Sequence, residues 1–351
     1  MTTPNVLGVC PAPIGRYERI VLGHGNGGRL GADLVKDVFI PAFQGPNPEP
    51  LEDQAILNVT GGARLAFTTD SFVVKPIFFP GGDIGCLSVY GTVNDLAMGG
   101  ATPLWLSAAF VLEEGLAMED LRRIVLSMRA AADRAGVKIV TGDTKVVDRG
   151  KGDQVFITTT GIGVVPSGVA LSITAARPGD RVLVSGTLGD HGIAIMSVRE
   201  GIGFDTVLES DCAPLDTLAR DLLRAAPGTR CMRDPTRGGL ASALHELAQG
   251  SRVGVALREA AIPLRPAVKG ACELLGLDPL HVANEGKLVA VVPADQADDA
   301  LAAMRAHPLG ADAAVVGEVV EDPRAMVTIR SLVGGDRVVT MLAGEQLPRI
   351  C

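Results

Sequence analysis

The sequence predicts a two-domain protein of the α/β and α+β classes that ends in a mobile tail. Its 351 residues are enough for two domains. Hydrophobic residues make up 47 % and charged residues 21 %, which excludes disorder of the whole chain. Strand-like and helix-like apolar patterns follow one another over most of the length. We therefore expect an N-terminal segment (1–45), a first domain (46–166), a second domain (176–335) and a tail (336–351).

The first two segments differ in composition. Residues 1–45 are rich in Gly and Pro and contain GHGNGGRLGADL at 23–34, and PAFQGPNPEP at 41–50 predicts a loop. The first domain has short apolar runs bounded by turn residues, which predict strands. These runs are Ala66–Thr69, Leu104–Leu112, Val137–Val140 and Val155–Thr160. A helix is predicted at Glu119–Ala135, where apolar residues recur at helical spacing behind two acids.

Strand and helix signals alternate in the second domain, after a boundary near Pro166–Gly179. Strands are expected at 181–186, 287–292, 314–320 and 326–330. Helices are expected at 191–200, Thr217–Ala226, Gly239–Gln249, Val268–Leu275 and Asp295–Ala306. This succession predicts a layered α+β or α/β domain.

No periodicity continues beyond Asp336, so residues 336–351 are expected to form a mobile tail. The tail ends in PRIC, and Cys351 is the last residue. Sixteen extended residues reach up to roughly 50 Å, and a free thiol with a pKa near 8.5 is partly ionised at neutral pH. A terminal cysteine could therefore carry a group to a distant site, although composition alone favours an accidental end residue.

Composition also excludes several classes of protein. The net charge is −8, no long basic run occurs and aromatic residues make up only 3 %, which argues against binding to nucleic acid or anionic membranes. The uncharged stretch Val155–Ala176 contains Gly and Pro, so we expect strand, turn and strand rather than a membrane helix. The first residues resemble no export signal, and six scattered cysteines without a CxxC pair indicate neither a zinc site nor a disulfide framework. We expect a cytoplasmic protein.

Acidic residues beside turns and glycines form the first candidate constellation. They are Asp53, Asp70, Asp83, Asp95, Asp143 and Asp234. Carboxylates bind Mg²⁺, and the free N–H groups of glycine turns bind phosphate oxygens. Any one of these residues is more often a turn or capping aspartate, but the set of six favours phosphate chemistry.

Further candidates surround this set. DPTRGGL (234–240) opens a predicted helix, so Gly238 and Gly239 would let an anion approach its N-terminus. Lys145, in GDTKVV, could meet a phosphate, and His191 and Glu285 stand in glycine turns as candidates for proton transfer. Each has an ordinary structural alternative. Neither a P-loop nor a dinucleotide fingerprint is present in the sequence.

The motifs together resemble a known family. GHGNGG, EDQA, TTDSFVVKPIFFPGGDIG, GTVNDLAMGGATP, TGDTKVV, DPTRGGL, NEGKL and the closing PRIC follow in this order. The sequence resembles the hydrogenase maturation family HypE, the carbamoyl dehydratases, over nearly the whole chain. That family belongs to the superfamily of aminoimidazole ribonucleotide synthetase and selenophosphate synthetase. The resemblance implies an N-terminal α/β domain that dimerises through its sheets, a C-terminal α+β domain, and ATP bound with Mg²⁺ in a cleft involving the N-terminal domains.

The resemblance also implies a reaction. The carbamoyltransferase HypF would load a carbamoyl group onto Cys351, and an ATP-dependent carbon–oxygen lyase reaction would dehydrate it to a thiocyanate. The cyanide would pass to iron on the HypC–HypD complex for a [NiFe]-hydrogenase. By analogy Asp53, Asp70, Asp95 and Asp234 would hold Mg²⁺. The remaining residues would be Asp143, Lys145, Gly238 and Gly239 at the nucleotide, Glu285 or His191 as the base, and Asp83 as a metal or orienting alternative.

One position departs from the family pattern, because Cys86 stands where a basic residue is frequent. Two alternatives remain open. A kinase or synthetase of the same superfamily would act on a free substrate and would not need Cys351. A scaffold would bind ATP only to organise its partners.

Overall fold

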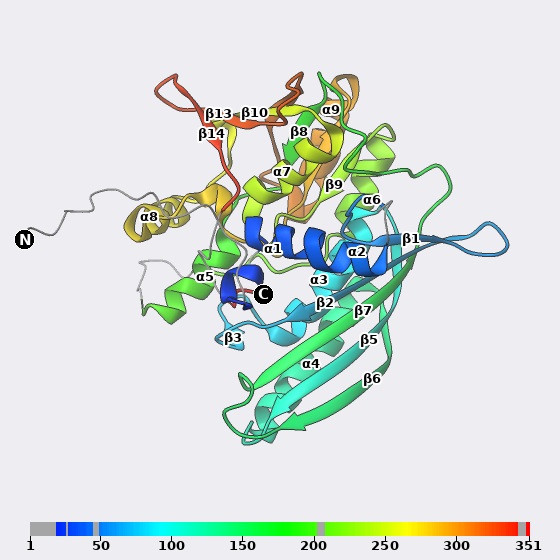
Figure 1. The fold of residues 1–351 in the computed structure, drawn as a ribbon, viewed down its shortest axis with the longest axis vertical. Helices are drawn as coiled ribbons and strands as arrows, with labels where there is room; N and C mark the ends of the chain where they lie inside the picture. Colours follow the sequence, from blue (N-terminus) through cyan, green and yellow to red (C-terminus); the bar gives the residue numbers. More distant parts are fainter. Residues whose placement is uncertain (1–18, 26, 45–48, 202–207, 343–348) are drawn as a thin grey trace, which may run out of the picture.

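Two β-sheets, one in each half of the chain, organise the protein (Figure 1). The computed structural model describes residues 19–25, 27–44, 49–201, 208–342 and 349–351. The sheets have five and seven strands, and helices pack against both. The predicted mixture of α and β structure is confirmed.

The N-terminal sheet has α-helices on one face only. Its spatial order is β1 (Ala55–Asn58), β2 (Arg64–Phe72), β7 (Val155–Val164), β5 (Thr102–Glu113) and β6 (Lys138–Val147). Only β5 and β6 are parallel. Helices α3 (Ile84–Met98) and α4 (Met118–Ala135) cover one face (Figure 1). Buried and half-buried residues alternate along β7, as period-two geometry requires when the other face is uncovered.

Helix α3 has no counterpart in the sequence prediction. All of its residues are buried except Cys86 and Asp95. A helix that is apolar or small on every side has no amphipathic period, so its pattern gives no helical signal. By contrast, α4 lies where the spacing predicts it, because one of its faces stays in solvent. The central position of α3 places Asp95 between the two lobes.

The C-terminal sheet has helices on both faces. Its spatial order is β14 (Asp336–Val339), β13 (Val327–Arg330), β10 (Gly254–Arg258), β12 (Ala314–Val320), β8 (Arg181–Val184), β11 (Val289–Val292) and β9 (Cys231–Arg233). One core joins the sheet to α7 (Gly239–Ser251), and the other joins it to α6 (Asp216–Ala225) and α9 (Ala297–Ala306). Two further helices are α5 (Asp190–Arg199) and α8 (Pro266–Leu275). The predicted helices are confirmed, whereas β9 and β10 were not predicted.

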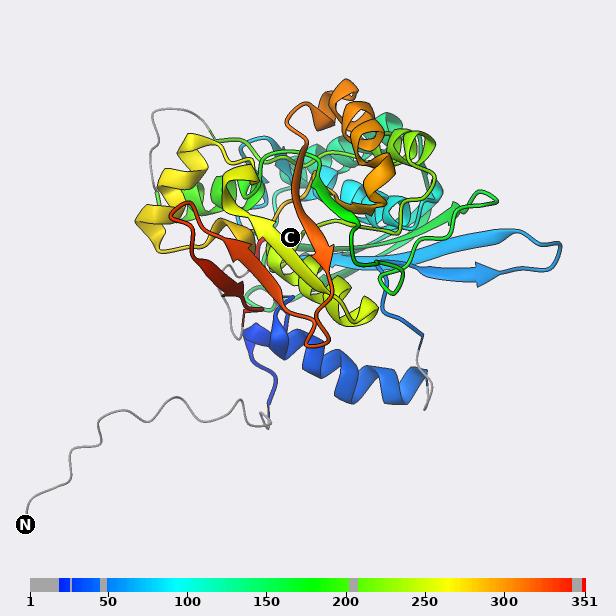
Figure 2. The same cartoon turned by 90° about the horizontal axis from the view of Figure 1, so that it is seen from above.

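The N-terminal segment contains a helix that lies to one side of the two sheets (Figure 2), and its first residue, Arg29, donates a backbone hydrogen bond to the Leu342 carbonyl. A short 3-10 turn (Leu22–Gly25) precedes α1 (Arg29–Leu34), a π-helical turn (Val35–Phe39) and α2 (Ile40–Phe43). The loop prediction for 41–50 is therefore wrong at its start, because α2 reaches Phe43. Residues 45–48 lie outside the described residues.

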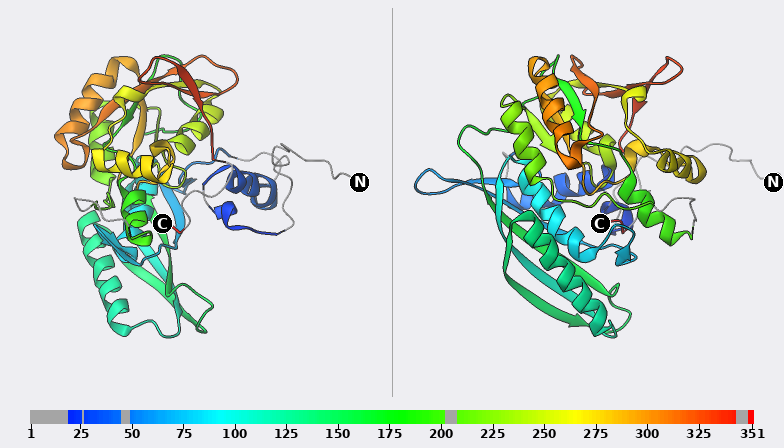
Figure 3. Two further views of the ribbon diagram at one scale, coloured as in Figure 1. Left: turned by 90° about the vertical axis from the view of Figure 1, so that its left-hand side faces the viewer. Right: turned by 180° about the vertical axis from the view of Figure 1, so that it is seen from behind.

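The C-terminal segment differs most from its prediction. The predicted start of a mobile tail at Asp336 is wrong, because residues 336–339 form β14 and pair with β13. Ile350 and Cys351 are buried, and the C-terminus lies in the middle of the molecule, between the lobes (Figure 3). The predicted second strand within Val155–Ala176 is also absent, since a loop follows β7. Within the described ranges, no helix combines the length and apolar character of a membrane span.

Candidate functional site

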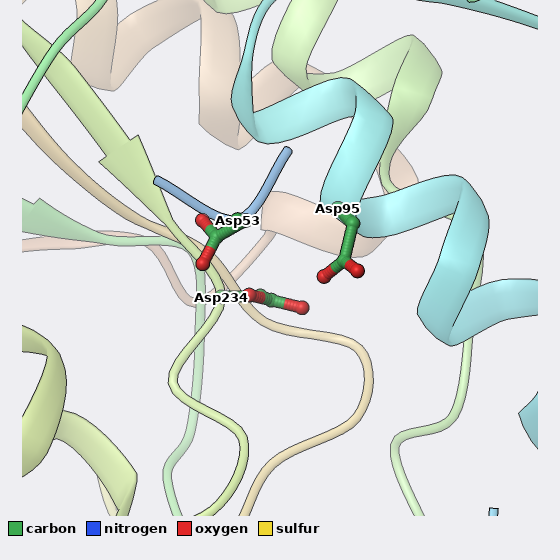
Figure 4. A group of neighbouring side chains, drawn as sticks. All are labelled: Asp53, Asp95 and Asp234. Carbon is green, nitrogen blue, oxygen red and sulfur yellow. The ribbon is translucent and has the colours of Figure 1, made fainter. Parts of the chain in front are cut away.

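Three aspartates from distant parts of the chain meet between the lobes (Figure 4). Asp53 precedes β1, Asp95 lies on α3, and Asp234 follows β9. One carboxylate oxygen from each lies within 4.8 Å of the others. Thr68 of β2 fixes the group, because its hydroxyl oxygen lies 2.8 Å from Asp95 Oδ2 and 3.0 Å from the Asp53 carbonyl oxygen and can donate its proton to either. The folding of both domains is therefore needed to assemble this cluster.

Burial raises the free energy of the ionised carboxylates in this cluster, because they lose contact with water. Burial, as the largest cause, raises the pKa of Asp53 and Asp95 well above the ordinary range, and mutual repulsion raises it further. Burial likewise raises the pKa of Asp234 to about 6, against the lowering effect of Arg233. The Arg233 guanidinium lies 3.0 Å from Asp53 and also pairs with Glu246. One arginine thus offsets only part of the negative charge.

The residues fit a hard divalent cation. Asp53 Oδ2 is buried and has no hydrogen-bond partner among the described atoms. Mg²⁺ prefers oxygen ligands and is bound through a few carboxylates together with water and phosphate oxygens. Asp53, Asp95 and Asp234 supply such oxygens. Asp70, the fourth predicted ligand, lines the same pocket but is outside the three-residue cluster.

The pocket around these acids has a volume of about 250 Å³. Its walls include Thr236, Arg237 and Gly239 at the start of α7, where the helix dipole favours an anion. Gly239 has φ +61°, and a Cβ there would lie 2.6 Å from the Leu280 carbonyl oxygen. Gly238 is the N-cap of α7 in the left-handed region and does not itself line the pocket.

The C-terminal cysteine lies in this pocket. Cys351 is only 8 % exposed, and its Sγ accepts a hydrogen bond from Arg237 Nη1 at 3.4 Å. Arg237 also approaches Asp70 Oδ1 at 4.0 Å. Burial raises the pKa of the Cys351 thiol to about 12, although the Arg237 charge opposes the rise. In this position the thiol is protonated at neutral pH.

Backbone hydrogen bonds hold the end of the chain against residues 73–75. The Val73 N–H donates to the main-chain oxygen of Cys351 at 2.9 Å, and the Lys75 N–H donates to the Arg349 carbonyl at 3.2 Å. The bonds are two residues apart on each segment and run in opposite order, as between antiparallel strands. His191 completes this contact, since its Nε2 lies 2.7 Å from the Ile350 carbonyl oxygen. We call residues 73–75 and His191 the tail cradle.

Glu285, a predicted candidate for proton transfer, lines the same pocket as Cys351. It is buried, and its Oε1 has no hydrogen-bond partner among the described atoms. Burial raises its pKa well above the ordinary range, and Asp234, Asp211 and Asp70 raise it further. Its backbone N–H donates to Asp211 Oδ1 at 3.0 Å.

Two predicted residues of the nucleotide site lie elsewhere in this chain. Cross-strand register places Gly142 in the same row as Asp70, so Asp143 and Lys145 point to the opposite face of the sheet. There they pair with each other at 3.0 Å and are exposed. Within one chain they do not join the pocket.

Asp83 and His191 have structural contacts in place of the predicted catalytic ones. Asp83 is the N-cap of α3, and its side chain accepts from the N–H groups of Gly85 and Cys86. It does not line the pocket, so the ordinary capping alternative holds. His191 is fully buried and contacts the tail backbone and Ser210, not the pocket.

Sequence reasoning did not single out Thr68, Arg233 and Glu246, which line the pocket with the aspartates. It expected Arg237 only to add positive charge ahead of the predicted helix. Arg233 and Arg237 flank the DPT of the motif that was singled out, so their position beside Asp234 was the available signal. Nothing in the local pattern distinguishes Thr68 or Glu246 from ordinary strand and helix residues.

Family models match both halves of the chain. Residues 51–165 match the N-terminal domain of AIR synthase related proteins, and residues 177–330 match their C-terminal domain. The chain thus has both domains of an AIR synthase related protein.

Curated relatives and solved structures narrow this class. The chain is 58 % identical over 333 residues to carbamoyl dehydratase HypE of Cupriavidus necator, covering 95 % of each chain. It is similar to the crystal structure of a HypE–HypF complex, with TM-score 0.83, 50 % identity and coverage of 88 % and 99 %. It is also similar to the crystal structure of HypE in complex with ATP, with TM-score 0.80, 48 % identity and coverage of 93 % and 98 %. The chain belongs to the HypE family of carbamoyl dehydratases.

Proposed function

We propose that this enzyme dehydrates a carbamoyl group carried on Cys351 to a thiocyanate at the expense of ATP, which supplies the cyanide ligand for the iron of a [NiFe]-hydrogenase. The position of the Cys351 sulfur in the aspartate-lined pocket is the single observation that carries this proposal. A kinase that acts on a free substrate, or a scaffold, has no need of a C-terminal thiol at this place. The ATP-bound HypE structure supports ATP as the phosphoryl donor.

The pocket residues suit activation of an amide oxygen. That oxygen is a poor leaving group, and its phosphorylation converts it into a phosphate ester that leaves readily. Mg²⁺ held by Asp53, Asp95 and Asp234, with Asp70 nearby, would neutralise charge on the transferring phosphoryl group. The N-terminus of α7 binds phosphate oxygens, and Arg237 places a fixed positive charge beside the sulfur.

Glu285 is the proposed base that removes the N–H protons as the C≡N bond forms. Its burial makes the ionised carboxylate a stronger proton acceptor than a solvated one. The free Oε1 leaves one oxygen available for the substrate nitrogen. His191 is not retained as a base, because both of its ring nitrogens have protein partners.

Mass spectrometry of the C-terminal peptide tests the proposal. The enzyme is incubated with the carbamoyltransferase, carbamoyl phosphate, ATP and Mg²⁺. We expect carbamoylation of Cys351 followed by loss of one water. Glu285→Gln is expected to stop at the carbamoylated peptide with a dehydration rate about 10²- to 10⁴-fold lower. Exposed Glu273→Gln on α8 is the matched control. Full dehydration by Glu285→Gln, or no modification of Cys351, would contradict the proposal.

A homodimer through the outer face of the N-terminal sheet accounts for its exposed apolar side chains. Phe67 and Trp105 are 41 % and 47 % exposed, and both lie opposite Ile162 in one cross-strand row. Asp143 and Lys145 share this face, so in the dimer they would meet the second chain, where we place their phosphate contact. Trp105→Glu is expected to give a monomer by sedimentation equilibrium. Leu332→Glu, on an exposed turn of the other domain, is expected to leave the dimer intact.

The proposed partners follow from the same chemistry. The carbamoyltransferase HypF would load Cys351, and the crystal structure of a HypE–HypF complex supports this pairing. The HypC–HypD complex would accept the cyanide. We place the reaction in the cytoplasm.

A further inference from the structure

Two cysteines outside the proposed chemistry lie next to each other between the lobes. Cys86 is in the first turn of α3, and Cys212 is in the loop before α6. Their side chains share a hydrogen bond. Both pack against the apolar cluster that contains Ile350 and Cys351. The pair therefore joins the N-terminal lobe to the C-terminal lobe at the end of the tail.

The two thiols have different surroundings. The N–H of Asp83 donates to Cys86 Sγ at 3.3 Å, and Cys86 lies at the N-terminal end of α3, where the helix dipole favours a negative charge. The hydrogen bond from Cys212 is the largest cause that lowers the pKa of Cys86, whereas the pKa of Cys212 is raised well above its ordinary value. A thiol with a lowered pKa in contact with a second thiol is the arrangement of a reactive cysteine and its resolving partner.

We propose that Cys86 and Cys212 are a dithiol site that hydroperoxides oxidise to an interlobe disulfide. The Cys86 thiol releases its proton, the thiolate attacks one oxygen of hydrogen peroxide, and the O–O bond breaks to give a sulfenic acid and hydroxide, which takes up the released proton to form one water. The Cys212 thiol then attacks the sulfenic sulfur and releases a second water. Overall, two thiols lose two protons and two electrons, and one peroxide is reduced to two waters.

Burial separates this pair from the other described cysteines. Cys86 and Cys212 are half-buried. Cys231 and Cys272 are each 1 % exposed, and burial raises the pKa of Cys272 to about 11. Cys351 in the pocket has a pKa raised to about 12. Peroxide is thus expected to attack Cys86 before any of these three.

The disulfide lies close to the tail cradle. The Cys212 N–H donates to Ser210 Oγ at 3.1 Å, and the same hydroxyl contacts His191 Nδ1 at 2.8 Å. Oxidation therefore fixes α3 to the loop that carries Ser210. Since a cross-link between distant residues restricts the unfolded chain, we also expect a higher Tm in the oxidised protein.

The full chain treated with a few equivalents of hydrogen peroxide, and then alkylated and digested without reductant, tests the site. We expect the peptide containing Cys86 joined to that containing Cys212, with a loss of two hydrogen atoms, and reversal by dithiothreitol. Cys86→Ser and Cys212→Ser are expected to lose this product, and Cys272→Ser to keep it.

Three results would overturn the proposal: free thiols at both positions after peroxide has oxidised methionines, a disulfide to Cys351 instead, or an unchanged product in Cys86→Ser. The wild-type peptide map decides the matter even if a serine variant folds poorly. Under reductant, Cys86→Ser is expected to retain dehydration on Cys351, so failure of this site is distinguishable from failure of the proposed function.

Discussion

Replacement of His191 by Phe tests how the C-terminal tail is held. The Ile350 carbonyl can only accept, so His191 Nε2 carries the proton and Nδ1 accepts from the Ser210 hydroxyl. Burial lowers the pKa of His191, which keeps the ring neutral near pH 7. Phe retains a ring at the edge-to-face contact with Phe79, whose centroid lies 5.5 Å away, but removes both hydrogen bonds.

The expected effect follows from the bond to Ile350. The Ile350 carbonyl can bind water when the tail leaves the pocket, so this neutral hydrogen bond stabilises the docked tail by about 0.5–1.5 kcal/mol. Its loss changes the equilibrium between docked and undocked tail by roughly 2- to 13-fold. Docked Cys351 has a pKa raised to about 12, so iodoacetamide alkylates almost only the undocked thiol. We therefore expect His191→Phe to raise the alkylation rate of Cys351 by that factor, measured by mass spectrometry of the C-terminal peptide.

His245 offers a matched control. Its Nε2 lies 2.7 Å from the Val339 carbonyl oxygen, which is the same bond length and type as at His191. His245→Phe removes a similar bond on β14 and is expected to leave the alkylation rate of Cys351 unchanged. Equal acceleration in both variants would show a general loss of stability and would refute the assigned role of His191, as would no change in either.

Three other predictions concern stability. Between about pH 4 and 6 the Asp234 carboxyl of the folded protein, with its pKa raised to about 6, holds a proton that the unfolded chain has lost. The free energy of unfolding of the metal-free protein, measured by urea titration, is therefore expected to fall by about 3 kcal/mol as pH rises through that window, and Mg²⁺ is expected to reverse the loss. A metal-free stability that does not change with pH would contradict this. Asp83→Ala is expected to cost about 1 kcal/mol in urea denaturation, because two N–H groups of α3 lose their cap, and an unchanged midpoint would argue against the capping role. Gly239→Ala is expected to lower Tm more than Gly136→Ala, since both glycines have positive φ but only Gly239 lacks space for a Cβ; similar losses would contradict the close approach at Gly239.

Helical periodicity predicts those helices that have one face in solvent. Helix α4 and most helices of the second domain lie at their expected positions, because their apolar residues recur on one side. Helix α3 is buried on every side and leaves no such period. Strand β14 was not predicted. It lies at the edge of the sheet and three of its four residues are exposed, so its sequence has no apolar run that would indicate a strand.

The site shows a similar limit. Asp53, Asp95 and Asp234 were expected as ligands, and the structure brings their oxygens together from three elements. Asp143 was predicted from the same turn-and-glycine pattern, yet the parity of β6 turns it to the opposite face of the sheet. A turn motif indicates that an aspartate is accessible, but strand register decides which surface it reaches. Register depends on pairing between distant strands, which the local sequence does not encode.

The raised pKa of docked Cys351 implies an order for the proposed reaction. Thiolate is the form that attacks a carbamoyl donor, and at pH 7.5 a free thiol with a pKa near 8.5 is about 10 % ionised. With its pKa raised to about 12, the docked thiol is ionised more than a thousandfold less. On the proposed function, we therefore expect loading to take place while the sulfur is outside the pocket. A carbamoylated sulfur has no proton to lose, so the acidic surroundings of Glu285 and Asp70 no longer oppose its chemistry there. Burial keeps the free thiol protonated in the pocket but does not oppose reaction of the carbamoylated sulfur. On the proposed function, we therefore expect Cys351 to be carbamoylated outside the pocket and the carbamoyl group to be dehydrated inside it.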